Sequence, residues 1–420
     1  MAGRRRVAFL LLLVLACGDR PGTTIRLWVH SGPGPEREAY AASVAAFNAT
    51  RSDVRVELTV LPEGTYGDQV HAAAIAGQLP EVLELDGPTV AEYAWARRLR
   101  PLDGLPALEA ARADLLPSLA AQGTYRGRLY ALGQYDAGLA LWGDRRLLAK
   151  ARVRAPRTVD EAWSRRDFER VLWRLKRVGV ARPLDLKLNY GAGEWFTFAF
   201  APLVWSLGGD LVDPATGRAR GHLDGPAARE AMGLLQAWAR AGYIDPAARN
   251  DADFVLGRSA LSYVGHWAWP TYHKALGRNL VLMPLPRFGE RAVTGSGSWC
   301  FALSAGGRHP QAAADLLAWL MSPREIRRVT TLNGAIPGTR TALRASPLYR
   351  PGGPLALFAE QLDRGLARTR PRTPAYPAIS AAFAEAVNNV LAGADPAREL
   401  GRAAAAVDEE MEDNPGFAGN

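Results

Sequence analysis

The chain has 420 residues, of which 48% are hydrophobic and 22% charged, and this length supports two or three domains with buried cores. Its net charge of +9 does not indicate a nucleic-acid partner, because three of the charges are Arg4, Arg5 and Arg6 and no basic run with interleaved aromatic residues occurs. Since Cys17 and Cys300 are the only cysteines, we expect the fold to depend on core burial without disulfides.

The amino-terminal segment predicts export. A basic region, residues 1–6, precedes the apolar stretch Val7–Ala16, which is about half the roughly 20 residues that a membrane span requires. This order indicates a secretory signal over residues 1–17 and excludes a transmembrane helix there.

The residues Val14-Leu15-Ala16-Cys17 resemble the lipobox of bacterial lipoproteins. The resemblance implies that Cys17 is acylated and anchors an exported protein to the membrane, in the periplasm or at the cell surface. The alternative is an ordinary cleaved signal in which this cysteine has no role.

The part of the chain after the signal begins with an α/β pattern. After a short linker, residues 18–24, the segment 25–29 alternates as a strand. Residues 40–47 repeat apolar side chains at helical spacing, and residues 54–60 alternate as a second strand. Strand, helix and strand at this spacing predict a right-handed parallel crossover.

The same pattern continues with a helix over residues 66–77, a strand over 81–85 and a helix over 89–99. In an α/β lobe, ligands bind at the carboxyl ends of the strands. We therefore expect the loops that follow these strands to lie close together, and they begin at His30, Glu63 and Asp86.

Later helices have recognisable ends. Thr158 and Glu161 fit a capping box that predicts a helix start, and Asp224 ahead of Gly225-Pro226 predicts another helix, which Gly242 should stop. No internal repeat is present. Three further helices are predicted over residues 311–321, 379–391 and 395–411.

Several short motifs occur in an order that resembles one protein family. Gly127–Leu132 followed by Leu139–Asp144 is similar to the family's crossover between lobes, although Gly133 stands where proline is usual and Trp142-Gly143 replaces Tyr-Asn. Taken together, the motifs resemble the family 1 extracellular solute-binding proteins, the maltose-binding type, over essentially the whole mature chain. The later motifs are Gly257–Ser262, Gly265–Trp269, Leu285-Pro286, Gly295–Trp299, Leu303-Ser304, Ala312–Met321 and Gly334–Pro337.

The resemblance implies a two-lobed α/β fold of the periplasmic-binding-protein type II class, in which each lobe is a central sheet flanked by helices. The chain would cross between the lobes near residues 133–138, 288–292 and 342–349. The implied lobes are residues 25–133 plus about 292–342, and residues 138–288 plus about 349–413, followed by a tail over 414–420.

The resemblance also implies a function: the substrate-binding subunit of an ABC importer. Such a protein captures a mono- or oligosaccharide between its lobes by hinge closure and delivers it to permease subunits driven by cytoplasmic ATPases. It would act as a monomer, without a cofactor.

Tryptophans are the first candidates for a sugar site, because an indole covers the apolar face of a sugar ring. Trp267 and Trp269 lie two residues apart before Pro270, and an extended segment would point both toward one side. Trp299 follows Gly295–Ser298, where glycines allow close backbone approach and Ser298 can bond a hydroxyl. For each tryptophan, packing in a core or a plain turn is the alternative.

Carboxylates and further polar groups complete the expected site, because they bind vicinal hydroxyls. The topology adds His30 and Ser31 at the end of the first strand, with Glu63 after the second strand. The resemblance implies acidic ligand residues at Asp86 and Asp136. The alternative for these carboxylates is a solvated loop or a helix cap.

Two more candidates complete the set. The resemblance implies an aromatic platform at Trp195, for which a core position is the alternative. Arg340 follows Ile336-Pro337 and is a possible cleft residue or a surface arginine.

Two rival functions remain open at this stage. Asp86 and Asp136 in one cleft would suit the acid and base of a carbohydrate-cleaving enzyme. In the second rival, the same fold binds a different small solute: a peptide, a polyamine, a phosphodiester or a metal chelate. A polyamine suits the acidic residues and tryptophans, since cations also bind aromatic faces. HExxH, paired CxxC, GxSxG and Walker sequences are all absent, and the six histidines are scattered, so metal binding has no support.

Overall fold

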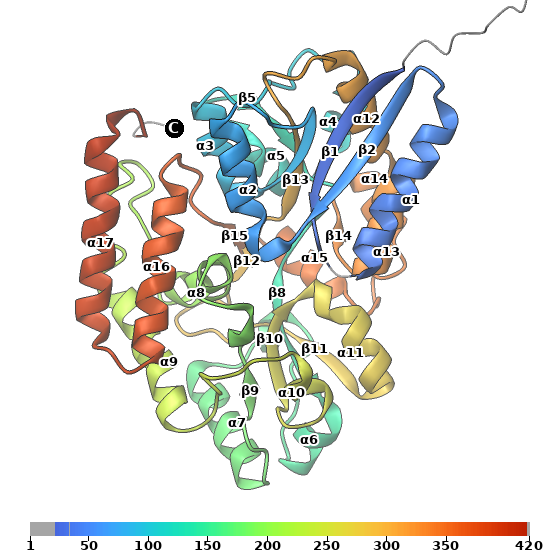
Figure 1. Cartoon of the computed structure of the whole chain (residues 1–420). Helices are drawn as coiled ribbons and strands as arrows, with labels where there is room; N and C mark the ends of the chain where they lie inside the picture. The colour runs from blue at the N-terminus through green and yellow to red at the C-terminus, as the bar shows by residue number, and fades with distance from the viewer. Residues whose placement is uncertain (1–21, 33, 418–420) are drawn as a thin grey trace, which may run out of the picture.

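The computed structural model describes residues 22–32 and 34–417, so the predicted signal, Cys17 and most of the linker lie outside the described residues. The described chain forms two α/β lobes, each with its own sheet and hydrophobic core (Figure 1). This confirms the expected two-lobed α/β fold. Over the described ranges, no helix combines the length and the apolar character that a membrane crossing needs.

The first sheet has five strands in the order β2-β1-β3-β13-β6. The first three strands run parallel, as predicted from the strand–helix–strand pattern, and β13 runs antiparallel to β3. The carboxyl ends of the parallel strands therefore meet the amino end of β13 at one edge. The strands are β1 (Thr23–His30), β2 (Val54–Leu61), β3 (Val82–Asp86), β6 (Ala131–Leu132) and β13 (Trp299–Leu303).

Helices cover both faces of this sheet because its strands are apolar on both sides. Ile25, Leu27 and Val29 pack toward α1, α12 and α13, whereas Trp28 packs toward α2 and α3. Each fully buried valine or leucine contributes about 1.5–3 kcal/mol to folding. The helices are α1 (Gly34–Thr50), α2 (Glu63–Ile75), α3 (Val90–Trp95), α12 (Pro310–Leu320) and α13 (Pro323–Asn333).

The second sheet has four strands in the order β11-β8-β10-β9. On the central strand β8, Leu141 packs toward α7, α8, α9, α16 and α17, and the neighbouring Trp142 packs toward α11 and α15 on the opposite face. The strands are β8 (Leu139–Asp144), β9 (Leu184–Asp185), β10 (Leu261–Gly265) and β11 (Leu280–Met283). The helices are α7 (Arg165–Arg177), α8 (Glu194–Ser206), α9 (Pro226–Arg240), α11 (Trp269–Leu276), α15 (Ala356–Asp363), α16 (Tyr376–Leu391) and α17 (Pro396–Asp413).

Shorter elements connect these layers. They are α4 (Glu109–Asp114), α5 (Pro117–Gln122), β4 (Thr124–Tyr125), β5 (Arg128–Leu129), α6 (Arg145–Lys150), α10 (Ala252–Val255) and α14 (Arg340–Arg344).

Two short ladders lie where the chain passes between the sheets. β7 (Tyr135–Asp136) pairs with β14 (Ile336–Pro337), and β12 (Thr294–Ser296) pairs with β15 (Ala367–Thr369). Thr294 Oγ1 also accepts a hydrogen bond from the N–H of Leu139 at 2.9 Å, which ties β12 to the start of β8. Several chain crossings are thus fastened to one another in this interlobe ladder.

The end of the described chain contacts the first lobe. After α17, the turn η7 (Pro415–Phe417) brings the Phe417 ring edge-on to Trp95, with the ring centres 4.8 Å apart. Arg126 Nη2 donates to the carbonyl oxygen of Gly416 at 3.1 Å. Trp95 and Phe417 also line a groove of about 400 Å³ between α2 and α3 on one side and the ends of α16 and α17 on the other.

Most predicted elements are confirmed, but two boundaries are wrong. The helix predicted over residues 89–99 ends at Trp95, because Arg97 adopts a positive φ of 57°. Thr158 and Glu161 do not start a long helix: that segment makes only a 3-10 turn. Helix α7 begins later, where Ser164 accepts a hydrogen bond from the N–H of Asp167. The second Ser/Thr in the segment is therefore the true cap.

Candidate functional site

The predicted loops at the carboxyl edge of the first sheet do lie together. β1, β2 and β3 are parallel neighbours, and the antiparallel register places Trp299 of β13 opposite Asp86. Ser31 Oγ accepts a hydrogen bond from the N–H of Glu63 at 3.1 Å, so the loops after β1 and β2 are joined directly. Sequence topology thus grouped the loops that begin at His30, Glu63 and Asp86 correctly, and the structure adds Trp299 to them.

His30 is packed beneath Trp299 and is only 3% exposed. The imidazole and indole rings are parallel within 8°, with centres 3.9 Å apart, and Tyr66 meets the indole edge-on. Trp299 is partly exposed, so it is the surface of this stack. His30 therefore supports the platform that Trp299 presents.

A buried cluster behind the platform, which we call the His30 cluster, consists of His30, Glu36, Tyr40 and Glu84. Glu84 Oε2 accepts from the N–H of His30 at 3.0 Å and lies 2.8 Å from its Nδ1. The other ring nitrogen lies 3.5 Å from Glu36 Oε1, and Tyr40 donates to Glu84. Burial alone would lower the pKa of His30, but the two carboxylates outweigh it and raise the pKa to about 9. The ring is therefore an imidazolium at neutral pH.

The second lobe contributes an aromatic wall. Trp195 lies in the first turn of α8, donates from Nε1 to the Leu186 carbonyl at 3.2 Å and contacts the half-exposed Tyr190 edge-on. Trp267 meets Trp195 at a ring-centre distance of 6.0 Å. A Cβ on Gly265 would lie 2.0 Å from the Trp267 ring, so glycine at this position permits the indole to pack there. The pair Trp195 and Trp267 is partly exposed, as a ligand platform requires.

Trp269 does not join this wall. The segment His266–Ala268 is a 3-10 turn, and Trp269 begins α11 with Pro270 in its first turn, a position where proline is favoured. Trp269 stacks on His273 and lies beside Trp142 in the lobe core. The expectation that Trp267 and Trp269 point to the same side is wrong, because the segment is helical and not extended.

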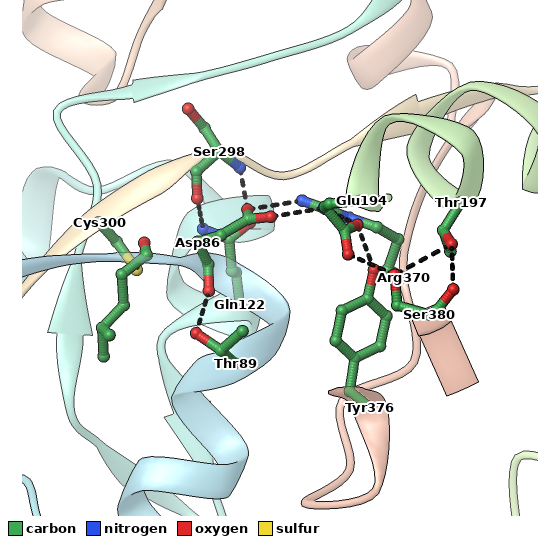
Figure 2. A network of polar contacts seen from close by, with 11 residues as sticks. Asp86, Thr89, Gln122, Glu194, Thr197, Ser298, Cys300, Arg370, Tyr376 and Ser380 are labelled. Atoms are coloured by element: carbon green, nitrogen blue, oxygen red, sulfur yellow. Dashed lines mark hydrogen bonds and ion pairs between the residues drawn. The ribbon is translucent and has the colours of Figure 1, made fainter. Parts of the chain in front are cut away.

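Charged groups from both lobes meet around a buried arginine in a network that we call the interlobe ion network (Figure 2). Arg370, which follows β15, binds Asp86 of the first lobe through two hydrogen bonds, Nη1 to Oδ2 at 2.7 Å and Nη2 to Oδ1 at 2.8 Å. The same Nη1 donates to Glu194 at the start of α8. Tyr376 and Ser380 of α16 also donate to Glu194.

Arg370 is buried to 5% exposure and lies 4.9 Å over the ring of Phe198, which in turn packs against Trp267. Burial alone would lower the pKa of Arg370, but Asp86 and Glu194 raise it well above its usual value, so the guanidinium stays charged. The network thus connects the platform of the first lobe to the aromatic wall of the second.

Sequence reasoning did not identify Arg370. It lies in the run Arg368-Thr369-Arg370-Pro371-Arg372 of an arginine-rich chain, where nothing local distinguishes it. Asp86 had been predicted, but the buried cation that binds it comes from a segment 284 residues away.

The loop before Trp299 is held from two sides. Gln122 accepts from the N–H of Ser298 at 3.0 Å and donates to its carbonyl at 2.7 Å. Gly297 has a φ of +104° that favours glycine, and its N–H donates to Asp136 Oδ1 at 2.9 Å. Asp136 is fully buried, which raises its pKa, and it also accepts from the N–H of Ala137. These contacts give Ser298 and Asp136 roles in shaping the loop.

Arg340 lies apart from the other candidates. Its side chain is exposed at the start of α14 and donates to the carbonyl oxygen of Ala113 at 3.0 Å. The structure therefore brings together Trp299, Asp86, Glu63 and Ser31 with Trp195 and Trp267, and leaves Arg340 on the surface of the first lobe.

No group of three or more His, Cys, Asp or Glu side chains within residues 22–32 and 34–417 has a geometry that could hold a metal ion. The arrangement instead combines partly exposed indoles with oriented carboxylates. Such a combination suits a neutral polyol, because rings cover its C–H faces and carboxylates accept from its hydroxyls.

Comparison with known proteins gives matches at the levels of family, sequence and fold. A family model described as bacterial extracellular solute-binding protein matches residues 42–350. An uncharacterised lipoprotein encoded upstream of oleD in Streptomyces antibioticus is 29% identical over 213 residues, which span 46% of each protein, so the chain spans about half the length of this relative.

Solved structures of bacterial binding proteins share the fold, among them the three that follow. The GacH receptor of Streptomyces glaucescens, solved without ligand and with acarbose, has a TM-score of 0.81 at 23% identity over 93% of this chain and 99% of its own. The cyclic α-maltosyl-1,6-maltose binding protein of Arthrobacter globiformis has a TM-score of 0.73 at 23% identity over 94% and 100%. The sugar-binding protein MalE of Xanthomonas citri has a TM-score of 0.76 at 20% identity over 94% and 98%.

Proposed function

Because the chain belongs to the bacterial extracellular solute-binding proteins, we propose that it captures a carbohydrate, mono- or oligosaccharide, for an ABC importer. Proteins that share its fold include one solved with acarbose and one named for binding a cyclic maltosyl-maltose, which supports a carbohydrate ligand. The captured sugar passes to a permease that cytoplasmic ATPases drive.

The observation that carries this proposal is the convergence of two chemically similar surfaces from separate lobes. The first lobe supplies Trp299 and Asp86, and the second supplies Trp195, Trp267 and Glu194. A sugar bound between them would place its C–H faces on the indoles and its hydroxyls on the carboxylates.

Hinge closure follows from this division of contacts. A ligand that binds one lobe gains contacts from the other lobe only when the lobes are close together. Its affinity is therefore higher for the closed form than for the open form, and this difference shifts the population toward the closed form. The interlobe ladder of β7 with β14 and β12 with β15 is the region about which the lobes would turn.

The test of the ligand class is titration of the purified protein by isothermal calorimetry and intrinsic tryptophan fluorescence against a carbohydrate panel and a polyamine panel. Carbohydrate binding is expected, and Trp267→Ala should weaken it about 10- to 100-fold, because a central aromatic anchor is lost. Trp173→Ala removes an indole that is 46% exposed on α7 and serves as the matched control. A response to polyamines alone would reject the carbohydrate assignment.

We further propose that the chain does not cleave its ligand. Hydrolysis of a glycoside needs two carboxyl groups that flank the scissile bond, one of them protonated. Both oxygens of Asp86 are bound by Arg370, and Asp136 is buried against backbone N–H groups. Incubation with oligosaccharides should therefore release no product, and sustained turnover measured by chromatography would contradict this.

For localisation, we propose an exported monomer anchored by acyl chains on Cys17, in line with the lipoprotein relative. Substitution Cys17→Ser in a bacterial host should move the protein from the membrane fraction to the soluble exported fraction. Unchanged membrane association would exclude the anchor.

The two lobes are proposed to have the boundaries expected from the sequence, residues 25–133 with 292–342 and residues 138–288 with 349–413. Apart from the first two residues of β1, the strands of the first and second sheets fall within these respective ranges. Helices α16 and α17 pack with the second core.

A further inference from the structure

The interlobe ion network contains one cation for two carboxylates that come from opposite lobes. Asp86 ends β3 of the first sheet, and Glu194 begins α8 of the second lobe. Arg370 follows β15 of the interlobe ladder and reaches both (Figure 2). No other arginine in the described ranges is as deeply buried as Arg370.

A buried guanidinium is stable only while its counter-charges stay within hydrogen-bond distance, because an isolated charge in a protein interior is strongly disfavoured. If the lobes separate, Asp86 and Glu194 move apart and Arg370 loses one of them. The closed arrangement is therefore the one in which Arg370 keeps both of its counter-charges.

The same contacts orient both carboxylates. Each Asp86 oxygen accepts one N–H of Arg370, and a carboxylate oxygen has a further lone pair for a hydroxyl. The side chain of Asp86 is 19% exposed, so it is not sealed in the protein. Glu194 is fixed by Arg370 together with Tyr376 and Ser380.

We infer that Arg370 is the positioning residue of the interlobe site: by binding Asp86 and Glu194 at once, it sets the closed geometry of the lobes and aims both carboxylates at the ligand. This inference rests on the proposed function for its ligand part, whereas its conformational part can be measured without ligand.

The experiment compares Arg370→Met, Arg370→Lys and a matched control, Arg364→Met. Arg364 also makes a two-bond pair with an aspartate, Asp160 at 2.7 and 2.8 Å, but on an exposed surface. Small-angle scattering of the ligand-free proteins and calorimetric affinity for the best carbohydrate of the panel are the two readouts, and thermal denaturation checks that each variant is folded.

We expect Arg370→Met to enlarge the ligand-free radius of gyration and to weaken binding about 100-fold, as loss of one partner of a buried charge pair does. Arg370→Lys should recover part of both, since lysine keeps the charge without the two-bond geometry. Arg364→Met should change neither.

A double-mutant cycle with Asp86→Asn tests whether Arg370 acts through that carboxylate. If it does, Asp86→Asn combined with Arg370→Met weakens binding no more than the stronger single variant. The inference would be overturned if the affinity losses of the two single variants multiply in the double variant. It would also be overturned if Arg370→Met and Arg370→Lys leave the radius of gyration and the affinity unchanged.

If Arg370→Met does not fold, Arg370→Lys and Asp86→Asn give the same decision. Failure of the wild-type protein to bind any carbohydrate would instead reject the proposed function and leave the scattering result to decide the closure part.

Discussion

The His30 cluster and the interlobe ion network share one arrangement of charges but lie in different parts of the molecule. Each holds one buried cation between two carboxylates: His30 between Glu84 and Glu36, and Arg370 between Asp86 and Glu194. All members of the first cluster belong to one lobe, whereas the second draws its carboxylates from both. The same chemistry is therefore expected to stabilise a lobe in one place and to set the relation between lobes in the other.

The largest effect expected from this comparison is a loss of stability on disrupting the His30 cluster. Glu84 is 1% exposed and is in hydrogen-bond contact with His30 and Tyr40. Glu84→Gln removes this buried charge, which should lower the free energy of unfolding by about 3 kcal/mol. Urea denaturation measures it. Glu81→Gln is the control on the same segment, because its partner Arg26 is 41% exposed, and it should cost less than about 1 kcal/mol.

The pH dependence of stability should also separate the two clusters. The pKa of His30 is raised from 6.5 to about 9 in the fold, chiefly because Glu84 and Glu36 outweigh burial. A raised pKa gives stability that is complete below pH 6.5 and is lost as the pH rises through about 9, on the order of 3 kcal/mol. The wild-type protein should therefore lose this stability over that window.

His30→Gln provides the reference, because it removes the titrating group and should show a flatter curve between pH 6.5 and 9. Arg370 does not titrate in this range, so Arg370→Lys should keep the wild-type slope. Parallel curves for wild type and His30→Gln would refute the assignment.

A smaller effect is expected on affinity when the interlobe network loses one charge. Glu194→Gln keeps the shape of the side chain but weakens its bond to Arg370, so we expect about tenfold weaker carbohydrate binding in calorimetry. The unfolding free energy should change less than in Glu84→Gln. The reverse pattern, a large stability loss with unchanged affinity, would remove the distinction between the clusters.

The smallest effect is expected at Arg340, which belongs to neither cluster. Its exposed guanidinium donates to the carbonyl oxygen of Ala113 on the surface of the first lobe, so Arg340→Ala should bind carbohydrate within about twofold of wild type. A loss of tenfold or more would show that the interlobe site extends to α14.

Strand alternation and the rule that ligand loops follow parallel strands were enough to group the loops that begin at His30, Glu63 and Asp86. Trp299 was a candidate for a different reason, the glycines and serines that precede it. The parts that could not be predicted depend on side-chain direction. His30 lies at the end of a strand, where ligand-binding residues are expected. Its ring nevertheless points into the lobe, because Nδ1 bonds to Glu84, two residues before Asp86. Trp267 and Trp269 differ because the chain turns helically between them. Arg370 is visible only once the fold brings residues 284 positions apart into contact.

The contact between Phe417 and Trp95 provides a built-in reporter. It joins the end of the second lobe to α3 of the first, and Trp95 takes no part in the interlobe site. Labelling the tryptophans with fluorine and assigning one resonance with Trp95→Phe would give a signal sensitive to lobe separation and untouched by the sugar itself. Movement of the protein and occupation of its site can in this way be followed as two independent spectroscopic quantities.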